Sequence, residues 1–395
     1  MADAAQIAKL GLFVSADYMG TSMMRSLLPQ LLVGSSASAV GSLESWYGLG
    51  QTLGSLSLPY LSDVLGRRRV LQLSCLGTSA GYGLSALAVA SGEPGSLVLV
   101  GRVVAGLTKQ TLTMARAMIG DMYGQESRQS SMALLTLFSC SGYLLGPLIG
   151  GWLADSAGVM APLRCVSALF LLLFLLCRAL PETAPALQRE APAGTSDWAT
   201  LRQPGSWRVV AVVALQEFVL TGWTSVSRPR IIKKRLPGGF SSTARYDTWL
   251  ILCVMLASGI WRTFPGIDTG HAMMVGIAFF ALGLGMLCWS TDAGCLFASA
   301  AVIGVGISAT RTLPATLLLK LAPDLKRGAV MGMLDLVGAC CRVAAPLLTG
   351  RIIDNFDDTA GLALLVLALL LAATLLLTAQ GSQSAWLSAD KAKAS

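Results

Sequence analysis

Charged side chains interrupt the long apolar segments of this chain, and they are the residues most able to do chemistry. The segment 97–119 carries Arg102, Lys109 and Arg116, spaced seven residues apart. At 100° per residue, a spacing of seven drifts by only about 20°, so we expect these cations to form one stripe along one helix. Cations held away from water attract anions strongly, so this stripe favours a solute with a carboxylate or another negative group.

Nine charged residues lie within apolar segments, three acids against six bases. They are Asp17, Arg25, Arg102, Lys109, Arg116, Glu217, Arg311, Asp335 and Arg342. A charge at bilayer depth costs roughly 2.5–3.5 kcal/mol on insertion scales, so each one needs a reason. We predict that Arg25, Arg102, Lys109, Arg116 and Arg311 line a cavity for an organic anion. The alternative for these cations is an ion pair between helices, or a long side chain that reaches the membrane interface.

The acids at membrane depth are candidates for proton exchange. Burial favours the neutral carboxyl and an adjacent cation favours the carboxylate, so a cation that moves can switch the proton on and off. We predict this role for Asp17 and, second, for Glu217, which follows the residue that corresponds to Asp17 in the second half of the chain. The alternative for Asp17 is a structural ion pair with a cation of the segment 97–119.

The composition is that of a membrane protein. Of the 395 residues, 54% are hydrophobic and only 13% are charged, whereas about a quarter is usual in soluble domains. Since a helical span needs roughly 20 mostly apolar residues, we predict an all-α membrane protein with twelve transmembrane helices. The predicted spans are 8–33, 42–61, 70–91, 96–119, 130–153, 159–180, 207–227, 246–263, 272–290, 293–319, 328–350 and 359–379.

The chain also has an internal repeat. At an offset of 199 residues, five identities fall in the same region of each half; among them, Pro147 meets Pro346 and Asp155 meets Asp354. We therefore predict two pseudo-symmetric six-helix bundles, at 1–180 and 207–395, joined by a cytoplasmic linker at 181–206. Parallel repeats of six spans are the architecture of transporters that move around a central site.

The formal net charge of +8 is explained by topology rather than by nucleic acid. Most of the cations fall in short loops between spans, which predicts cytoplasmic N- and C-termini; the kind of membrane is not predicted. Six cations in the loop 228–245 break this pattern. Either the seventh span ends early or this loop faces an unusual compartment.

Two classes of function are disfavoured. The nine cysteines contain no C-x-x-C pair and no cluster with metal-ligand spacing, so we expect neither a metal nor a cofactor. No G-x-S-x-G, H-E-x-x-H or Walker pattern is present, so we expect no enzyme.

Small residues recur in the segment 130–153. Gly142, Gly146 and Gly150 are four residues apart, so one face of the helix lacks side chains and another helix can approach closely. Pro147 lacks a backbone donor and is expected to kink or hinge this helix. Together with Gly151, these residues are candidates for a moving interface.

The turn Leu61-Ser-Asp63-Val-Leu-Gly66-Arg67-Arg68-Arg69 resembles the loop motif of the major facilitator superfamily, with Pro59 and Val64 as departures. The segment from Arg102 to Gly106 resembles the fourth-span motif, and the segment from Gly142 to Gly151 the antiporter motif, whose first glycine is here Ala133. Residues 10–155 look closest to the tetracycline-resistance-like branch and its eukaryotic orphan relatives.

The resemblance implies a gate at the loop motif. Asp63 would brace against the start of the eleventh span, and Asp121 would pair with the arginines Arg67 and Arg68. For Asp335 and Arg342 we predict a gate between the halves, with a local structural pair as the alternative.

We therefore expect a monomeric carrier that moves a small organic solute across a lipid bilayer by alternating access, coupled to protons, with anions favoured. Two alternatives remain: a drug-efflux antiporter for non-anionic compounds, and a transport-inactive receptor or scaffold with the same fold.

Overall fold

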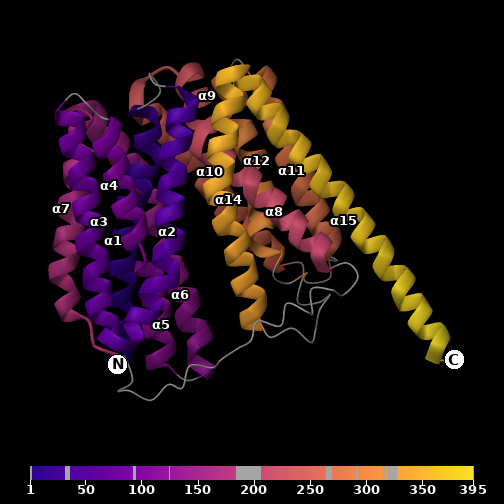
Figure 1. Cartoon of the computed structure of the whole chain (residues 1–395), viewed down its shortest axis with the longest axis horizontal. Coiled ribbons are helices and arrows are strands. Elements are labelled where there is room, and N and C mark those ends of the chain that lie inside the picture. Colours follow the sequence, from indigo (N-terminus) through magenta and orange to yellow (C-terminus); the bar gives the residue numbers. More distant parts are fainter. Residues whose placement is uncertain are drawn as a thin grey trace. The chain divides into compact units, whose positions relative to one another are not determined.

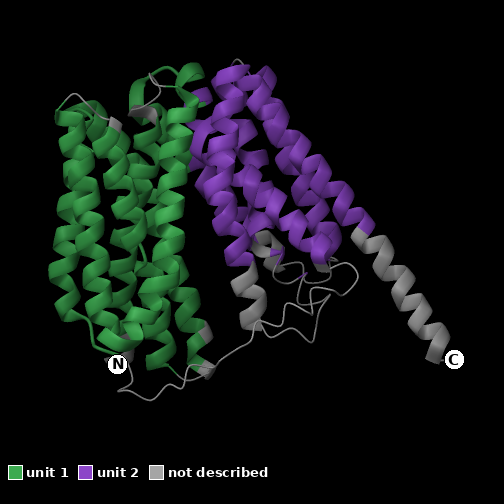
Figure 2. Cartoon of the chain, viewed as in Figure 1, with its two compact units in different colours: residues 1–190, 232–248 green, residues 191–231, 249–395 purple. Residues whose placement is uncertain are grey.

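The part of the chain that the computed structural model describes is almost entirely helical and contains no strand. It comprises residues 2–31, 36–91, 95–123, 125–183, 206–263, 269–290, 292–314, 317 and 327–394. The helices divide into two compact units, shown in green and purple in Figure 2. The first consists of residues 1–190 and 232–248, and the second of residues 191–231 and 249–395.

The first unit is a bundle of helices that run alongside one another (Figure 1). Its helices are α1 (Ala2–Leu31), α2 (Ala37–Leu65), α3 (Arg67–Ala90), α4 (Gly95–Thr108), α5 (Thr111–Met122), α6 (Gln125–Ala157) and α7 (Met160–Leu176). Helix α1 packs along α6, α3 packs against α4 and α7, and α2 packs against α4. Large apolar side chains such as Met24, Tyr82, Met118 and Phe170 fill the space between them.

The second unit is built in the same way. Its helices are α8 (Ser206–Gly222), a π-helical segment (Trp223–Ser227), α9 (Arg228–Arg235), α10 (Gly239–Thr263), α11 (Thr269–Trp289), α12 (Ala293–Thr312), α14 (Arg327–Asn355) and α15 (Asp358–Ala394). Helix α8 packs against α14 and α15, and α11 packs against α12 and α15. Residues 232–248, from the end of α9 and the start of α10, group with the first unit.

Within the described residues each predicted span coincides with helix, apart from a break in the fourth, so the predicted all-α membrane fold is confirmed. The last residues of the span 293–319 and most of the linker 181–206 lie outside the described residues. Eight helices of the described part are long and apolar enough to cross a membrane on their own. The domain limits at 180 and 207 stay a prediction.

The basic segment after the seventh span is not a loop. Helix α8 continues through the π-helical segment into α9, so the chain is helical from Ser206 to Arg235. Five of the six cations of this segment thus lie on this helix rather than in a loop, and the two alternatives given for the segment stay predictions. Within α9, Arg228 is buried and Arg230 forms an ion pair with Asp358 at 3.4 Å.

Side chains and one glycine fix where several helices begin. The Ser36 hydroxyl accepts the Ala39 N–H at 3.1 Å at the start of α2, and the Asp292 carboxylate accepts the Gly294 N–H at 2.9 Å at the start of α12. Each satisfies a donor that has no partner within its helix. Between α2 and α3, Gly66 has φ +99°, which side chains rarely tolerate.

The fourth predicted span is interrupted. Helix α4 ends at Thr108 and α5 begins at Thr111, so Lys109 and Gln110 lie in a break between helices of 14 and 12 residues. Neither piece is long enough to span a bilayer alone, since about 20 residues are needed. The prediction of a single uninterrupted cationic stripe over 97–119 is therefore wrong, and the break becomes part of the candidate site.

Candidate functional site

Asp17 is the centre of the candidate site. It lies midway along α1 with no exposed surface, and its carboxylate forms an ion pair with the Lys109 ammonium. The Thr111 hydroxyl donates to the other carboxylate oxygen at 2.9 Å. A carboxylate held by a cation and a hydroxyl in a dry interior is stabilised only while both partners stay in place.

Lys109 is held over two aromatic rings as well. Its ammonium nitrogen lies 4.8 Å from the centre of the Phe170 ring and 5.9 Å from that of the Tyr18 ring. The faces of aromatic rings attract cations, most strongly where water is excluded. The ion pair predicted as the alternative for Asp17 is thus the arrangement in the structure, and it joins α1 to the break in the fourth span.

Polar contacts from α2 and α3 stabilise the break between α4 and α5. The Gln110 N–H contacts the Ser74 hydroxyl at 3.2 Å, and the Gln110 side-chain amide donates to the carbonyl of Gln51 at 3.2 Å. The Thr108 and Thr78 hydroxyls are 3.3 Å apart. The backbone N–H of Gln110, which would bond within a continuous helix, thus contacts a side chain of α3, and the Gln110 side chain binds α2.

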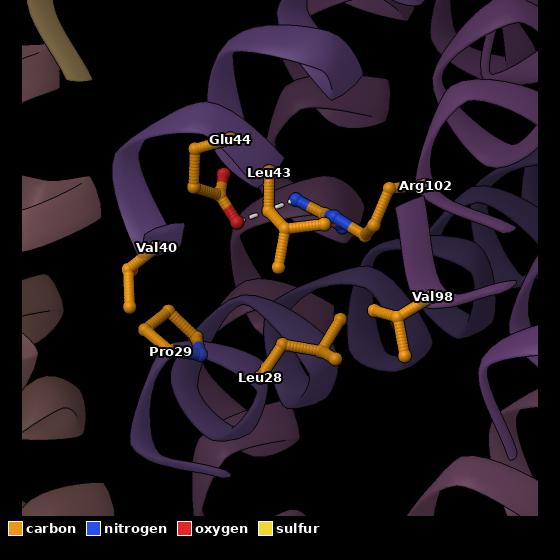
Figure 3. A pocket seen from close by; sticks show the side chains of 7 residues that line it. All are labelled: Leu28, Pro29, Val40, Leu43, Glu44, Val98 and Arg102. Carbon is orange, nitrogen blue, oxygen red and sulfur yellow. Dashed lines mark hydrogen bonds and ion pairs between the residues drawn. The ribbon is translucent and has the colours of Figure 1, made fainter. Parts of the chain in front are cut away.

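A second buried ion pair joins α2 and α4. Arg102 Nη2 lies 2.6 Å from Glu44 Oε1, and the guanidinium carbon lies 4.0 Å from the centre of the Tyr47 ring. Only 4% of Arg102 is exposed. Both residues line a small recess together with Leu28, Pro29, Val40, Leu43 and Val98 (Figure 3).

Of the other three cations predicted to line the cavity, one lies in the interior of the protein and two are exposed. Arg25 on α1 is half-buried and donates to the Tyr143 hydroxyl of α6 at 2.8 Å. Arg116 on α5 and Arg311 on α12 are exposed. The structure therefore brings Arg25, Arg102 and Lys109 into the interior of the first unit, and it leaves Arg116 at the surface.

The predicted excess of three positive charges in the interior is too large. It leaves out Glu44, which neutralises Arg102, and Asp247, which is buried near the start of α10. Glu44 stands alone among uncharged residues of α2, at Ser42-Leu-Glu44-Ser-Trp46. A single acid within an apolar segment is the same pattern that identifies Asp17, so the sequence contains a signal for Glu44.

The loop motif forms a compact ionic cluster around Arg67. Its guanidinium contacts Asp63 Oδ1 at 2.7 Å, Asp121 Oδ2 at 3.1 Å and the Ser62 hydroxyl. Asp121 ends α5, so this cluster ties the loop between α2 and α3 to the fourth span. The resemblance places Asp63 against the start of the segment 328–350. The side chains there are not among those that the structure describes.

Glu182 completes this cluster and was not found from the sequence. Its carboxylate accepts the backbone N–H of Arg67 at 2.8 Å and that of Arg68 at 3.3 Å. An added Cβ at Gly66 would lie 2.6 Å from the same carboxylate. The residue that follows Pro181 thus caps the N-terminus of α3, a position that attracts negative charge.

The glycines of the segment 130–153 are the contact surface of α6. A Cβ at Gly142 would overlap the Ser15 carbonyl of α1, and one at Gly146 would overlap the Ser22 hydroxyl. Gly150 faces Met23 of α1, and Gly151 faces Ala244 of α10. Helix α6 continues through Pro147.

We expect Gly142→Ala to destabilise the protein, because the added methyl group has no space against the backbone of α1. Overpacking of this kind costs about 1–3 kcal/mol, so the apparent melting temperature of the solubilised protein should fall. Gly120→Ala is the matched control, since nothing lies within 4 Å of a Cβ there. Equal melting temperatures for the two variants would contradict the tight packing.

In the second unit, Glu217 and Arg342 converge on one glycine. A Cβ at Gly338 of α14 would lie 3.3 Å from Arg342 Nη1 and 4.0 Å from Glu217 Oε2. Both side chains are half-buried, whereas Asp335 is exposed. The structure therefore brings Glu217 of α8 near Arg342 and leaves Asp335 at the surface of the described part of this unit.

Residues 10–267 match the family model described as Major Facilitator Superfamily. The chain belongs to the Major Facilitator Superfamily. Among its relatives, tetracycline resistance protein class E of Escherichia coli is 35% identical over 167 residues, which are 40% of this chain and 39% of that protein. Major facilitator superfamily domain-containing protein 10 of Homo sapiens is 29% identical over 235 residues, 57% of this chain and 46% of that protein.

Solved structures of this superfamily have the same fold. A bacterial homologue of the human lysosomal transporter Spinster aligns with a TM-score of 0.76 at 15% identity, over 96% of this chain and 97% of that one. The human organic anion transporter MFSD10 (TETRAN) aligns with a TM-score of 0.65 at 20% identity, over 94% and 98%. At such identities the alignments establish the fold alone.

These comparisons confirm the predicted superfamily and both predicted branches. The matched regions span less than half the length of the curated relatives named above. The chain is thus a multi-pass membrane protein of a superfamily of transporters, and not an enzyme.

Proposed function

We propose that the chain is a secondary active transporter that moves a small organic anion by alternating access, with a proton as the coupled ion. The observation that carries the proposal is the buried Asp17–Lys109 pair at the break of the fourth span. A charged pair inside a membrane bundle is costly as a purely structural element, and membrane-depth acids are typical of proton pathways.

Asp17 is the proton-accepting group in this proposal. Lys109 and Thr111 both donate to its carboxylate. A shift at Lys109–Gln110 that withdraws the ammonium would leave a dry, unpaired carboxylate, which then takes a proton. Glu217, close to Arg342, is the corresponding candidate in the second unit.

The anion preference rests on the cations of the first unit. Arg25, Arg102 and Lys109 lie inside it. Glu44 and Asp17 pair with the last two, and Asp247 is a further buried acid. A cation of this set attracts an anion when the acid beside it moves away or becomes neutral. Arg116 and Arg311 are exposed, and they would attract the anion only if their side chains border the path of the solute.

The loop cluster and the glycine interface would serve the conformational change. Arg67 holds oxygens of Asp63, Asp121 and Ser62 at once. In this proposal the cluster opens and closes as one unit, with Gly66 and Arg68 beside it as further gating residues. Gly142, Gly146, Pro147, Gly150 and Gly151 let α6 slide on its neighbours, and Asp335 with Arg342 would act as a gate. The proposed carrier is a monomer with both termini in the cytoplasm.

Efflux of drug-like compounds is a second candidate, because one set of relatives consists of tetracycline resistance proteins. In that case the interior cations would hold the acids in place rather than bind the solute. The two candidates differ in the charge of the compounds that are exchanged.

Reconstituted liposomes test the proposal and separate the two candidates. Purified protein should catalyse counterflow of labelled organic anions, and an inward proton gradient should change the rate. Counterflow of neutral drugs alone would favour efflux. If neither organic anions nor neutral drugs show counterflow, the proposal of transport is overturned and a receptor or scaffold is favoured.

A further inference from the structure

The break between α4 and α5 contains no residue type that requires one. Sharp interruptions of a helix occur mostly at proline or glycine, or where a group from elsewhere inserts into the ladder of hydrogen bonds. The four residues from Thr108 to Thr111 include neither proline nor glycine. This part of the chain can therefore also form a continuous helix, and contacts from other helices must hold the break in place.

Gln110 makes two of these contacts. Its side-chain amide donates to the carbonyl of Gln51 in α2 at 3.2 Å, and its backbone N–H contacts the Ser74 hydroxyl of α3 at 3.2 Å. Only 4% of Gln110 is exposed, so water does not easily replace these partners. The residue thus binds the break to both helices that cover α4.

A continuous helix would turn Lys109 away from Asp17. In α4, the Arg102 guanidinium lies over the Tyr47 ring of α2, and a Cβ at Gly106 would lie 2.4 Å from the Tyr47 carbonyl. Residues 102, 106 and 109 share one face of an uninterrupted helix, because they are separated by four and three residues. That face is directed towards α2. In the structure the break instead lets the Lys109 ammonium reach Asp17 of α1.

We propose that Gln110 is a positioning residue that holds Lys109 on Asp17. In this inference the fourth span alternates between the observed break and a continuous helix in which the ion pair is open. The inference rests on the proposed function, for which it names the residue and the helical segment that control the coupling site.

Helix α4 is the fixed part of the fourth span and α5 is the part that turns. Added Cβ atoms at Gly50 of α2 and Gly81 of α3 would lie 2.7 and 2.6 Å from backbone carbonyls of α4, so its backbone is tightly held. Nothing lies within 4 Å of a Cβ at Gly120 of α5. Because Asp121 of α5 contacts Arg67, a turn of α5 carries the opening of the ion pair to the loop cluster.

Double-mutant cycles on the solubilised full-length protein test the positioning role without requiring transport. The interaction between Asp17→Asn and Lys109→Met in the melting temperature is measured in the wild type and in variants at residue 110. Gln110→Leu removes the amide and favours a helix, so this interaction should fall to about zero. A residue that merely adds stability would lower the melting temperature and leave the interaction unchanged. Gln110→Met carries the same expectation and replaces the leucine variant if that variant does not fold.

Gln110→Gly separates the formation of a helix from the loss of the amide. It loses the same side-chain bond, but glycine disfavours a helix interior, so the break and most of the interaction should remain. Thr113→Val is the matched control. It removes a bond to the Gln110 side-chain oxygen within α5 and leaves the bond to α2 in place, so the interaction should stay close to the wild-type value.

The outcomes decide between the two parts of the inference. An interaction in Gln110→Leu as large as in the wild type would overturn the positioning role. Its equal loss in Gln110→Leu and Gln110→Gly would overturn the alternation between break and helix. If the expected pattern is found but liposomes show no counterflow, the proposed function fails and the positioning role of Gln110 stands.

Discussion

Asp17→Asn is expected to abolish uptake driven by a pH gradient while solute exchange continues. Asparagine has nearly the same shape and still accepts the Thr111 hydrogen bond, but it cannot lose or gain a proton at neutral pH. Exchange needs only that the loaded carrier changes its orientation, whereas net proton-driven uptake needs the proton itself. We expect the pH-driven component to fall by about 100-fold, which is the lower limit usually seen when a proton-transfer group is lost.

The measurement is uptake into liposomes with and without a proton gradient, compared with counterflow in the same preparation. Asp292→Asn is a matched control, because Asp292 is exposed and asparagine caps a helix as well as aspartate does. A variant with unchanged pH dependence would remove Asp17 from the coupling step. Loss of both activities in a folded protein would instead point to a role in the orientation change.

The helical fold and the importance of the first half could be predicted from the sequence. Apolar segments of about 20 residues and an offset of 199 specify the number of helices and the repeat, because the membrane restricts the chain to few architectures. The glycine spacing from Gly142 to Gly150 likewise predicted a close helix contact. It could not identify α1 as the partner, since close approach depends on both surfaces.

The break at Lys109–Gln110 could not be predicted, and it changes the meaning of the cationic stripe. The four polar residues from Thr108 to Thr111 interrupt the apolar segment 97–119 but are compatible with a continuous helix, and the partners that stabilise the break lie far away, at Gln51 and Ser74. Tertiary contacts therefore decide the local structure. The same holds for the ion pairs: a spacing of seven placed Arg102 and Lys109 inside, but only the fold shows that each faces an acid from another helix.

Lys109→Met is expected to cause the largest loss of stability among single substitutions in the first unit. Methionine is apolar and of similar length, so it fills the space between Phe170 and Tyr18 but leaves Asp17 buried without a cation. Removing one partner of a buried ion pair costs about 3–5 kcal/mol. The apparent melting temperature of the solubilised protein is the direct measurement, at a pH well above the ordinary range of a carboxyl group.

The double variant Asp17→Asn, Lys109→Met distinguishes a coupled pair from a solute-binding lysine. Because it removes both charges, it should recover most of the lost stability, and the interaction between the two substitutions measures the pair itself. If Lys109 instead served mainly to bind the anionic solute, the single variant would lose affinity but keep its melting temperature, and Asp17→Asn would restore nothing. Recovery of stability without recovery of pH-driven uptake is the outcome that the buried pair predicts, since the charges that cost stability are the same charges that make the site respond to protons.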